Sequence, residues 1–77
     1  MYDIISSDRI GKQIREMRIS RGMNAEDLAR EIGTSTSAVI MYECGRRVPR
    51  DEIKVRIANF FGTTMENIFY PKKKNET

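Results

Sequence analysis

The sequence predicts a compact all-α domain of five helices, for two reasons. Apolar residues recur at spacings of three and four over successive segments, which is the repeat of an amphipathic helix, and no stretch shows the alternation of a strand. Each segment is followed by a residue that ends helices, namely Gly22, Gly33, Gly45, Gly62 or Pro71. We therefore expect one domain over residues 7–70, with an arm at residues 1–6 and a flexible basic tail at residues 71–77.

Composition restricts the class of protein. Hydrophobic residues make up 39% and charged residues 32% of the 77 residues, a mixture typical of soluble globular domains. No apolar run approaches the ~20 residues that a membrane span needs, and residues 1–5 lack the basic and apolar regions of a secretory signal. We therefore expect a cytoplasmic protein with no membrane partner.

The chain has one cysteine, Cys44, and no histidine. Zinc sites need several cysteine or histidine ligands, and the common nucleophile–base sets of enzymes use histidine. We therefore predict that the protein is not an enzyme and holds no metal or cofactor. The net charge of +3 permits a nucleic-acid partner without requiring one.

The first predicted helix begins near Ser7, and Ser7 or Asp8 is expected to cap its start. Ile10, Ile14 and Met17 follow at spacings of four and three, so they form one apolar stripe. The helix is expected to end before Gly22.

Two short helices follow, and the turn between them is tight. Asn24 is a good cap for the second helix, Gly33 ends that helix, and only two residues later Ser35 caps the third. The apolar stripes are Leu28, Ala29 and Ile32 in the second helix and Ala38, Val39 and Tyr42 in the third. Two short helices joined by a glycine-containing turn are typical of a helix-turn-helix unit.

The rest of the chain predicts two further helices. A loop that contains Pro49 precedes a fourth helix at about residues 51–61. Its apolar face consists of Ile53, Ile57, Phe60 and Phe61. Thr63 or Thr64 is expected to cap a final short helix, in which Ile68 and Phe69 are apolar.

The segment over residues 24–45 resembles the Cro- and lambda-repressor-like helix-turn-helix family, also called XRE-type. The shared features are a Leu-Ala pair, a glycine, a short polar turn and a Glu-Asn-Gly ending; here they are Leu28-Ala29, Gly33, residues 34–37 and Glu43-Cys44-Gly45. The likeness continues through Pro49, Ile57-Ala58, Phe61-Gly62 and Ile68-Phe69, so it covers roughly residues 7–70. Agreement over five helices is more specific than a lone motif.

The resemblance implies a sequence-specific, DNA-binding transcriptional regulator, which we expect to repress transcription. The helix from Thr36 to about Glu43 would lie in the major groove of double-stranded DNA, and a homodimer would place two such helices about 34–36 Å apart on a pseudo-palindromic operator. The predicted base-reading residues are Thr36, Ser37, Ile40 and Met41. Ser and Thr hydroxyls suit several base edges, whereas Ile and Met would pack on thymine methyl groups.

The resemblance also implies contacts with DNA phosphates, which add affinity and salt dependence but no sequence choice. The predicted phosphate contacts are Asn24, Ser35, Arg21, Arg46, Arg47 and Arg50. Arg46 and Arg47 directly follow the predicted recognition helix, and the alternative for them is an ordinary polar loop.

This chain departs from the family pattern at three places. Ala25 stands where relatives commonly have a glutamine that clamps a phosphate, although a backbone N–H at that helix start can replace it. Cys44 replaces the usual asparagine, and we interpret it as a small residue before a glycine rather than as a redox switch. Asp51 and Lys54 stand where apolar residues are common, so Ile53 and Val48 are expected to fill that space.

Arg18 and Glu43 match a pair that, in relatives, joins the first helix to the end of the third. The alternative is two solvated surface charges. We expect the pair to form and to hold the recognition helix, so that Glu43→Ala loses DNA binding through instability.

Two questions stay open at the level of sequence. The apolar residues Ile68, Phe69 and Tyr70, together with Tyr2, Ile4 and Ile5, form either the dimer contact or part of the chain's own core. The alternative function is an antitoxin-like or adaptor module, in which Ile40 and Met41 face a protein partner. Salt distinguishes the two functions, because binding through several phosphates weakens steeply as salt rises.

Overall fold

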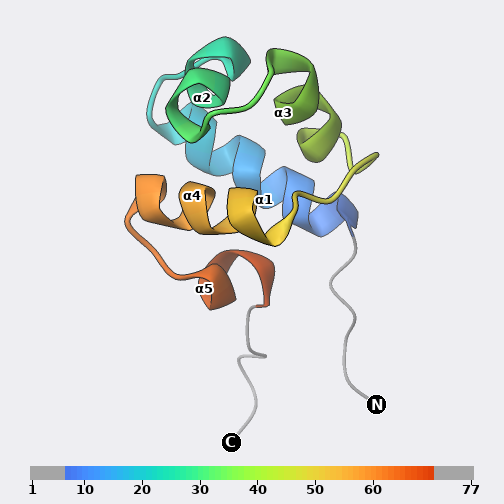
Figure 1. The fold of residues 1–77 in the computed structure, drawn as a ribbon, viewed down its shortest axis with the longest axis vertical. Helices are drawn as coiled ribbons and strands as arrows, with labels where there is room; N and C mark the ends of the chain where they lie inside the picture. Colours follow the sequence, from blue (N-terminus) through green and yellow to red (C-terminus); the bar gives the residue numbers. More distant parts are fainter. Residues whose placement is uncertain (1–6, 71–77) are drawn as a thin grey trace, which may run out of the picture.

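Five helices follow one another along residues 7–70, which are the residues described by the computed structural model (Figure 1). They are α1 (Ser7–Ser20), α2 (Ala25–Ile32), α3 (Thr36–Glu43), α4 (Asp51–Phe61) and α5 (Met65–Phe69). The predicted all-α class and the five helices are confirmed. The predicted arm and tail, including Tyr2, Ile4 and Ile5, lie outside the described residues.

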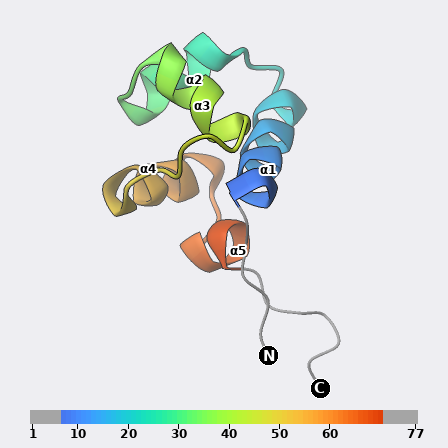
Figure 2. The same cartoon turned by 90° about the vertical axis from the view of Figure 1, so that its right-hand side faces the viewer.

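The helices enclose one apolar core. α1 packs against α3 and α5, α2 against α3 and α4, and α4 against α5, so every helix has two neighbours (Figures 1 and 2). The buried apolar residues are Ile10 and Ile14 from α1, Leu28, Ala29 and Ile32 from α2, Ala38, Val39 and Tyr42 from α3, Ile57 and Ala58 from α4, and Ile68 and Phe69 from α5. The core thus joins residues from all five helices, as their apolar stripes predict.

Side-chain caps define the starts of α2 and α3. Asn24 and Asp27 form a reciprocal capping box at α2, and Ser35 accepts a hydrogen bond of 3.0 Å from the Ala38 amide at α3. Between the two helices Gly33 has φ 73°, a left-handed conformation that a side chain would strain. The predicted cap of α1 is wrong, because Asp8 lies within its first turn and the helix already begins at Ser7.

The start of α4 differs from the expectation. Val48 is 48% exposed and does not fill the space beside Lys54, whereas Ile53 is partly buried against the core. Lys54 fills that space itself, since it is only 8% exposed and its ammonium donates to the Tyr70 hydroxyl at 2.9 Å. A lysine can bury its aliphatic stem while its charged end finds a partner, which sequence pattern alone does not reveal.

α5 answers one open question for two of the residues concerned. Ile68 and Phe69 are buried in the core, with Phe69 fully so, and Tyr70 is exposed. Ile68 and Phe69 therefore stabilise the single chain.

Candidate nucleic-acid interface

α3 presents one outer face that carries the four predicted base-reading residues. Ser37 and Ile40 are exposed, and Thr36 and Met41 are half-buried at the edges of this face. Val39 and Tyr42 point to the opposite side and are buried, because a helix turns about 100° per residue. Ile40 is 48% exposed, so this face offers an apolar side chain to the solvent. The outer face of α3 is therefore open to a partner and mixes hydroxyl with apolar groups.

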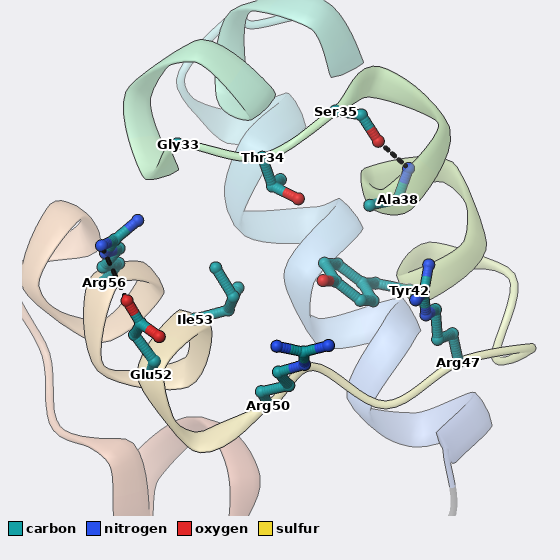
Figure 3. Close-up of a pocket in the computed structure, with 10 residues that line it drawn as sticks. All are labelled: Gly33, Thr34, Ser35, Ala38, Tyr42, Arg47, Arg50, Glu52, Ile53 and Arg56. Atoms are coloured by element: carbon teal, nitrogen blue, oxygen red, sulfur yellow. Dashed lines mark hydrogen bonds and ion pairs between the residues drawn. The ribbon is translucent and has the colours of Figure 1, made fainter.

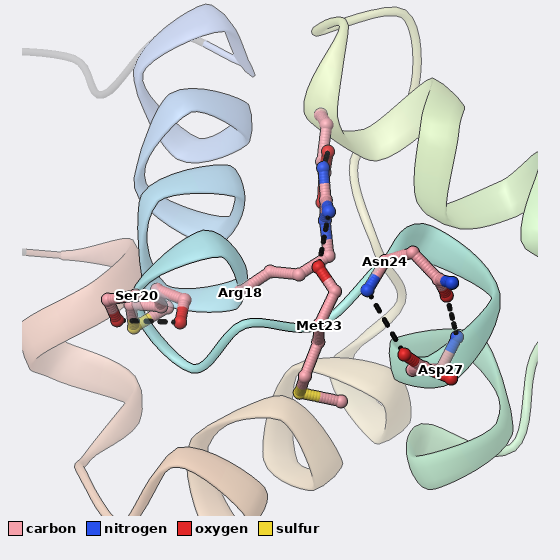
Figure 4. A network of polar contacts seen from close by, with 7 residues as sticks. Arg18, Ser20, Met23, Asn24 and Asp27 are labelled. Carbon is pink, nitrogen blue, oxygen red and sulfur yellow. Dashed lines mark hydrogen bonds and ion pairs between the residues drawn. The ribbon is translucent and has the colours of Figure 1, made fainter.

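The start of α3 suits an anion better than the start of α2 does. The first turn of α3 contains no acidic residue, and the Ser35 hydroxyl keeps a proton to donate while its oxygen caps Ala38. At α2, the first turn holds Glu26 and Asp27, and the Asp27 carboxylate accepts from the Asn24 amide at 3.1 Å (Figure 4). The donors that remain there are the side-chain amide of Asn24 and the backbone N–H groups of Ala25 and Glu26.

Three arginines follow α3 in the loop that leads to α4. Arg46, Arg47 and Arg50 are all exposed, and among residues 7–70 none of their guanidinium groups has a hydrogen bond or ion pair. Gly45 has φ 80° and turns the chain sharply after α3, so the first two arginines lie beside the end of that helix. Their charge is available to an anionic partner.

Arg21 occupies a different place from the one expected. Its guanidinium donates to the Phe60 carbonyl at 3.2 Å and lies 5.2 and 5.1 Å from the ring centres of Phe60 and Phe61. It is thus engaged with the end of α4 rather than with the loop arginines. Arg21 is nevertheless exposed and donates only one hydrogen bond, so its assignment as a phosphate contact stays a prediction.

Arg18 and Glu43 are brought together across 25 residues of sequence. Arg18 Nε and Nη2 donate to the two Glu43 carboxylate oxygens at 2.7 and 2.9 Å. Arg18 Nη1 also donates to the Met23 carbonyl at 2.8 Å, as Figure 4 shows. The side chains are only 13% and 8% exposed. The hydrogen bonds to Glu43 raise the pKa of Arg18, against the opposing effect of burial. One guanidinium therefore ties α1, the α1–α2 turn and the end of α3 together.

Gly11 is a residue whose role the sequence interpretation missed. A Cβ placed there would collide with the Tyr42 carbonyl oxygen and lie 2.6 Å from that of Glu43. The backbone of α1 therefore touches the last turn of α3 directly. A glycine inside a helix lowers helix stability by about 1 kcal/mol relative to alanine. Its presence within the predicted first helix was therefore the available sign that another part of the chain comes close there.

A hollow of about 330 Å³ lies beside α3, between the α2–α3 turn and the start of α4 (Figure 3). Its lining residues are Gly33, Thr34, Ser35, Ala38, Tyr42, Arg47, Arg50, Glu52, Ile53 and Arg56. It brings two of the loop arginines and the Ser35 cap to one place. The sequence predicted each of these three separately and gave no indication that they converge.

Other kinds of site find no support in residues 7–70. This part of the chain contains no cluster of three or more Cys, Asp or Glu side chains arranged to hold a metal ion. None of its helices is long and apolar enough to cross a membrane.

Comparison with known proteins agrees with this geometry. The family described as Helix-turn-helix matches residues 14–68. The chain is 29% identical over 63 residues to the cryptic phage CTXphi transcriptional repressor RstR of Vibrio cholerae, covering 82% of this chain and 57% of that protein. It is 33% identical over 57 residues to an uncharacterised helix-turn-helix-type transcriptional regulator of Methanocaldococcus jannaschii, covering 74% of this chain and 86% of that protein. The chain thus spans little more than half the length of RstR.

Solved structures show the same fold. The restriction-modification controller protein C.AhdI of Aeromonas hydrophila superposes with a TM-score of 0.76 at 25% identity, covering 82% of this chain and 96% of that one. The LexA repressor of Eubacterium rectale gives a TM-score of 0.83 at 17% identity, covering 100% of this chain and 82% of that one, which is a likeness of fold alone. The relatives named above are described as transcriptional regulators. The chain therefore belongs to the XRE-type helix-turn-helix family, as its sequence pattern indicates.

Proposed function

We propose that this protein is a DNA-binding transcriptional regulator that represses by occupying an operator. α3 lies in the major groove, Thr36, Ser37, Ile40 and Met41 meet the base edges, and a homodimer binds a pseudo-palindromic site. Arg46, Arg47, Arg50, Ser35 and the amide of Asn24 hold the phosphate backbone. A cytoplasmic location follows from this role.

The observation that carries the proposal is the outer face of α3. That face is exposed, lacks acidic side chains in its first turn, and is followed at once by three unpaired arginines. Hydroxyl and apolar groups on such a helix match base edges, while the arginines match phosphates. Repression rests on the relative RstR, which is named a transcriptional repressor.

The test is selection of bound duplexes from a random pool at low and moderate salt. We expect an inverted repeat to be recovered and to be lost when Thr36, Ser37, Ile40 and Met41 are all replaced by alanine. In transcription from a promoter that carries the recovered repeat, the protein should reduce transcript yield.

The matched control places alanine on the outer side of α1 instead, at Gln13, Glu16 and Ile19, which are all exposed. This control should recover the same repeat as the unaltered protein. If neither protein recovers a motif and all retention disappears at moderate salt, binding is only electrostatic. The adaptor function, with Ile40 facing a protein, then takes first place.

A further inference from the structure

We propose that α5, together with Tyr70 that follows it, is a strap that opens while the rest of the fold stays closed, and that the buried charge of Lys54 makes it easy to open. In the closed state the strap covers the Lys54 ammonium. In the open state the ammonium returns to water. The inference concerns a part of the fold away from α3, so it stands independently of the proposed function.

Lys54 carries a charge that is largely removed from water without a close partner of opposite charge. Its side chain is only 10% exposed, whereas the Asp51 carboxylate, 3.8 Å from its ammonium, is 92% exposed and therefore solvated. Its hydrogen bond of 2.9 Å goes to the neutral hydroxyl of Tyr70. Removal of a charge from water costs free energy, and a hydroxyl and a solvated carboxylate return only part of that cost. Lys54 is thus a source of instability in the closed state.

The strap supplies the cover over this charge. The ammonium of Lys54 lies 5.4 Å from the ring centre of Phe69 and 5.1 Å from that of Tyr70, so cation–π attraction offsets a further part of the cost. Lys54 is also the fourth residue of α4, near the helix end at which a positive charge is disfavoured. When Phe69 and Tyr70 move away, water replaces them around the ammonium. Hydration of Lys54 therefore favours the open state.

The strap is attached in a way that lets it leave alone. α5 has five residues, too few to hold a helix without packing, and its main contacts are with α1 and α4 at the side of the molecule away from α2 (Figures 1 and 2). It follows Gly62, which has φ 69° and open space where a Cβ would lie. Burial of Ile68 and Phe69 opposes opening. An element with so few contacts opens at a lower free energy than the whole fold does.

The first experiment measures hydrogen exchange of single amides by NMR in the full-length protein at several low urea concentrations. The amides of Ile68 and Tyr70 report on the strap, since they donate to the carbonyls of Thr64 and Glu66. Ile14 and Ile57, which are fully buried, report on the core. We expect the strap amides to be at least about tenfold less protected than the core amides. Their protection should also fall less steeply with urea, because a local opening exposes less surface.

Two variants should change the protection of the strap amides in opposite directions. Lys54→Met keeps the apolar stem and removes the charge, so protection should rise by about tenfold. Tyr70→Phe keeps the ring and removes the hydroxyl that accepts from Lys54, so protection should fall by about tenfold. A lysine whose contacts simply stabilised the closed strap would give a fall in protection for Lys54→Met as well.

Lys12→Met is the matched control, since Lys12 is an exposed lysine of α1. It should leave the protection of the strap amides unchanged. Two results would overturn the proposal. One is exchange of the strap and core amides at the same rate and with the same urea dependence in the unaltered protein. The other is unchanged or lower protection of Ile68 and Tyr70 in Lys54→Met.

Discussion

Arg18 and Glu43 show how much one side-chain pair contributes here. Their two hydrogen bonds are short, both groups are largely removed from water, and a third bond reaches the Met23 carbonyl. A buried pair adds little compared with apolar packing, but removal of one member leaves an unpaired buried charge. The pair therefore matters most when it is broken, because Arg18 would then keep only its hydrogen bond to the Met23 carbonyl and have no partner of opposite charge.

We predict that Glu43→Ala lowers the free energy of unfolding by about 3–5 kcal/mol, a large part of what a small domain has. Urea denaturation measures this change. Glu31→Ala is the matched control, since Glu31 is an exposed glutamate of α2. An unfolding midpoint for Glu43→Ala equal to that of the control would show that the pair does not stabilise the fold.

The raised pKa of Arg18 has a definite consequence for pH dependence. A cation whose pKa is higher in the folded state stabilises fully wherever the unfolded side chain is also protonated, and its contribution is lost only as pH rises through the folded value. The ordinary pKa of arginine is already far above neutrality. The contribution of Arg18 should therefore be the same from pH 6 to pH 8.

The helix α3 is positioned by contacts with its neighbours along its whole length. Ser35 caps its start, the Arg18–Glu43 pair holds its end, and the backbone of α1 at Gly11 touches its last carbonyl groups. Gly45, just after α3, approaches Asp8 of α1 in the same way. The outer face of α3 therefore has a fixed orientation relative to the rest of the fold, which a base-reading helix requires.

For Gly11→Ala, the sign of the change in stability shows whether α1 and α3 touch at this point. In an ordinary helix position this change stabilises by up to about 1 kcal/mol. Here we expect a net loss of about 1 kcal/mol or more, because the new methyl group would force α1 and α3 apart. Denaturation of Gly11→Ala beside Gln13→Ala, an exposed position on the same helix, checks this. A gain in stability would mean that α1 and α3 do not touch at this point.

The molecule as a whole combines a small core with an uneven distribution of charge. Its net charge is only +3, yet three unpaired arginines lie together next to α3. Each phosphate contact that a protein makes releases counterions, so the slope of log affinity against log salt counts these contacts. The change in this slope on removal of one contact residue reports the oligomeric state, since every contact occurs twice in a homodimer.

We predict that Arg46→Ala reduces the magnitude of this slope by roughly 1.8 if a homodimer binds the operator, and by roughly 0.9 if a monomer binds. Fluorescence anisotropy at several salt concentrations measures the slope. Lys12→Ala, which removes the same charge from the outer side of α1, should leave it unchanged. An unchanged slope for Arg46→Ala would remove Arg46 from the phosphate contacts.

Local patterns were sufficient to predict the five helices, the caps at Asn24 and Ser35, and the tight turn at Gly33, and they offered Thr63 or Thr64 for the cap of α5, which is Thr64. These features depend on residues within a few positions of one another, and periodicity and cap chemistry act over that range. The apolar stripes could be predicted for the same reason, because the spacing of apolar residues along a helix identifies the side that is buried.

Tertiary packing decided which partners the remaining side chains find. Arg21 lies on Phe60 and Phe61, Lys54 reaches Tyr70, and Tyr42 opens onto the arginine-lined hollow. Each of these contacts joins separate helices, and a long side chain has several partners within reach until those helices are packed. The sequence therefore identified the helix-turn-helix unit that contains α3, whereas only the packed structure showed which arginines remain unpaired beside that helix within residues 7–70.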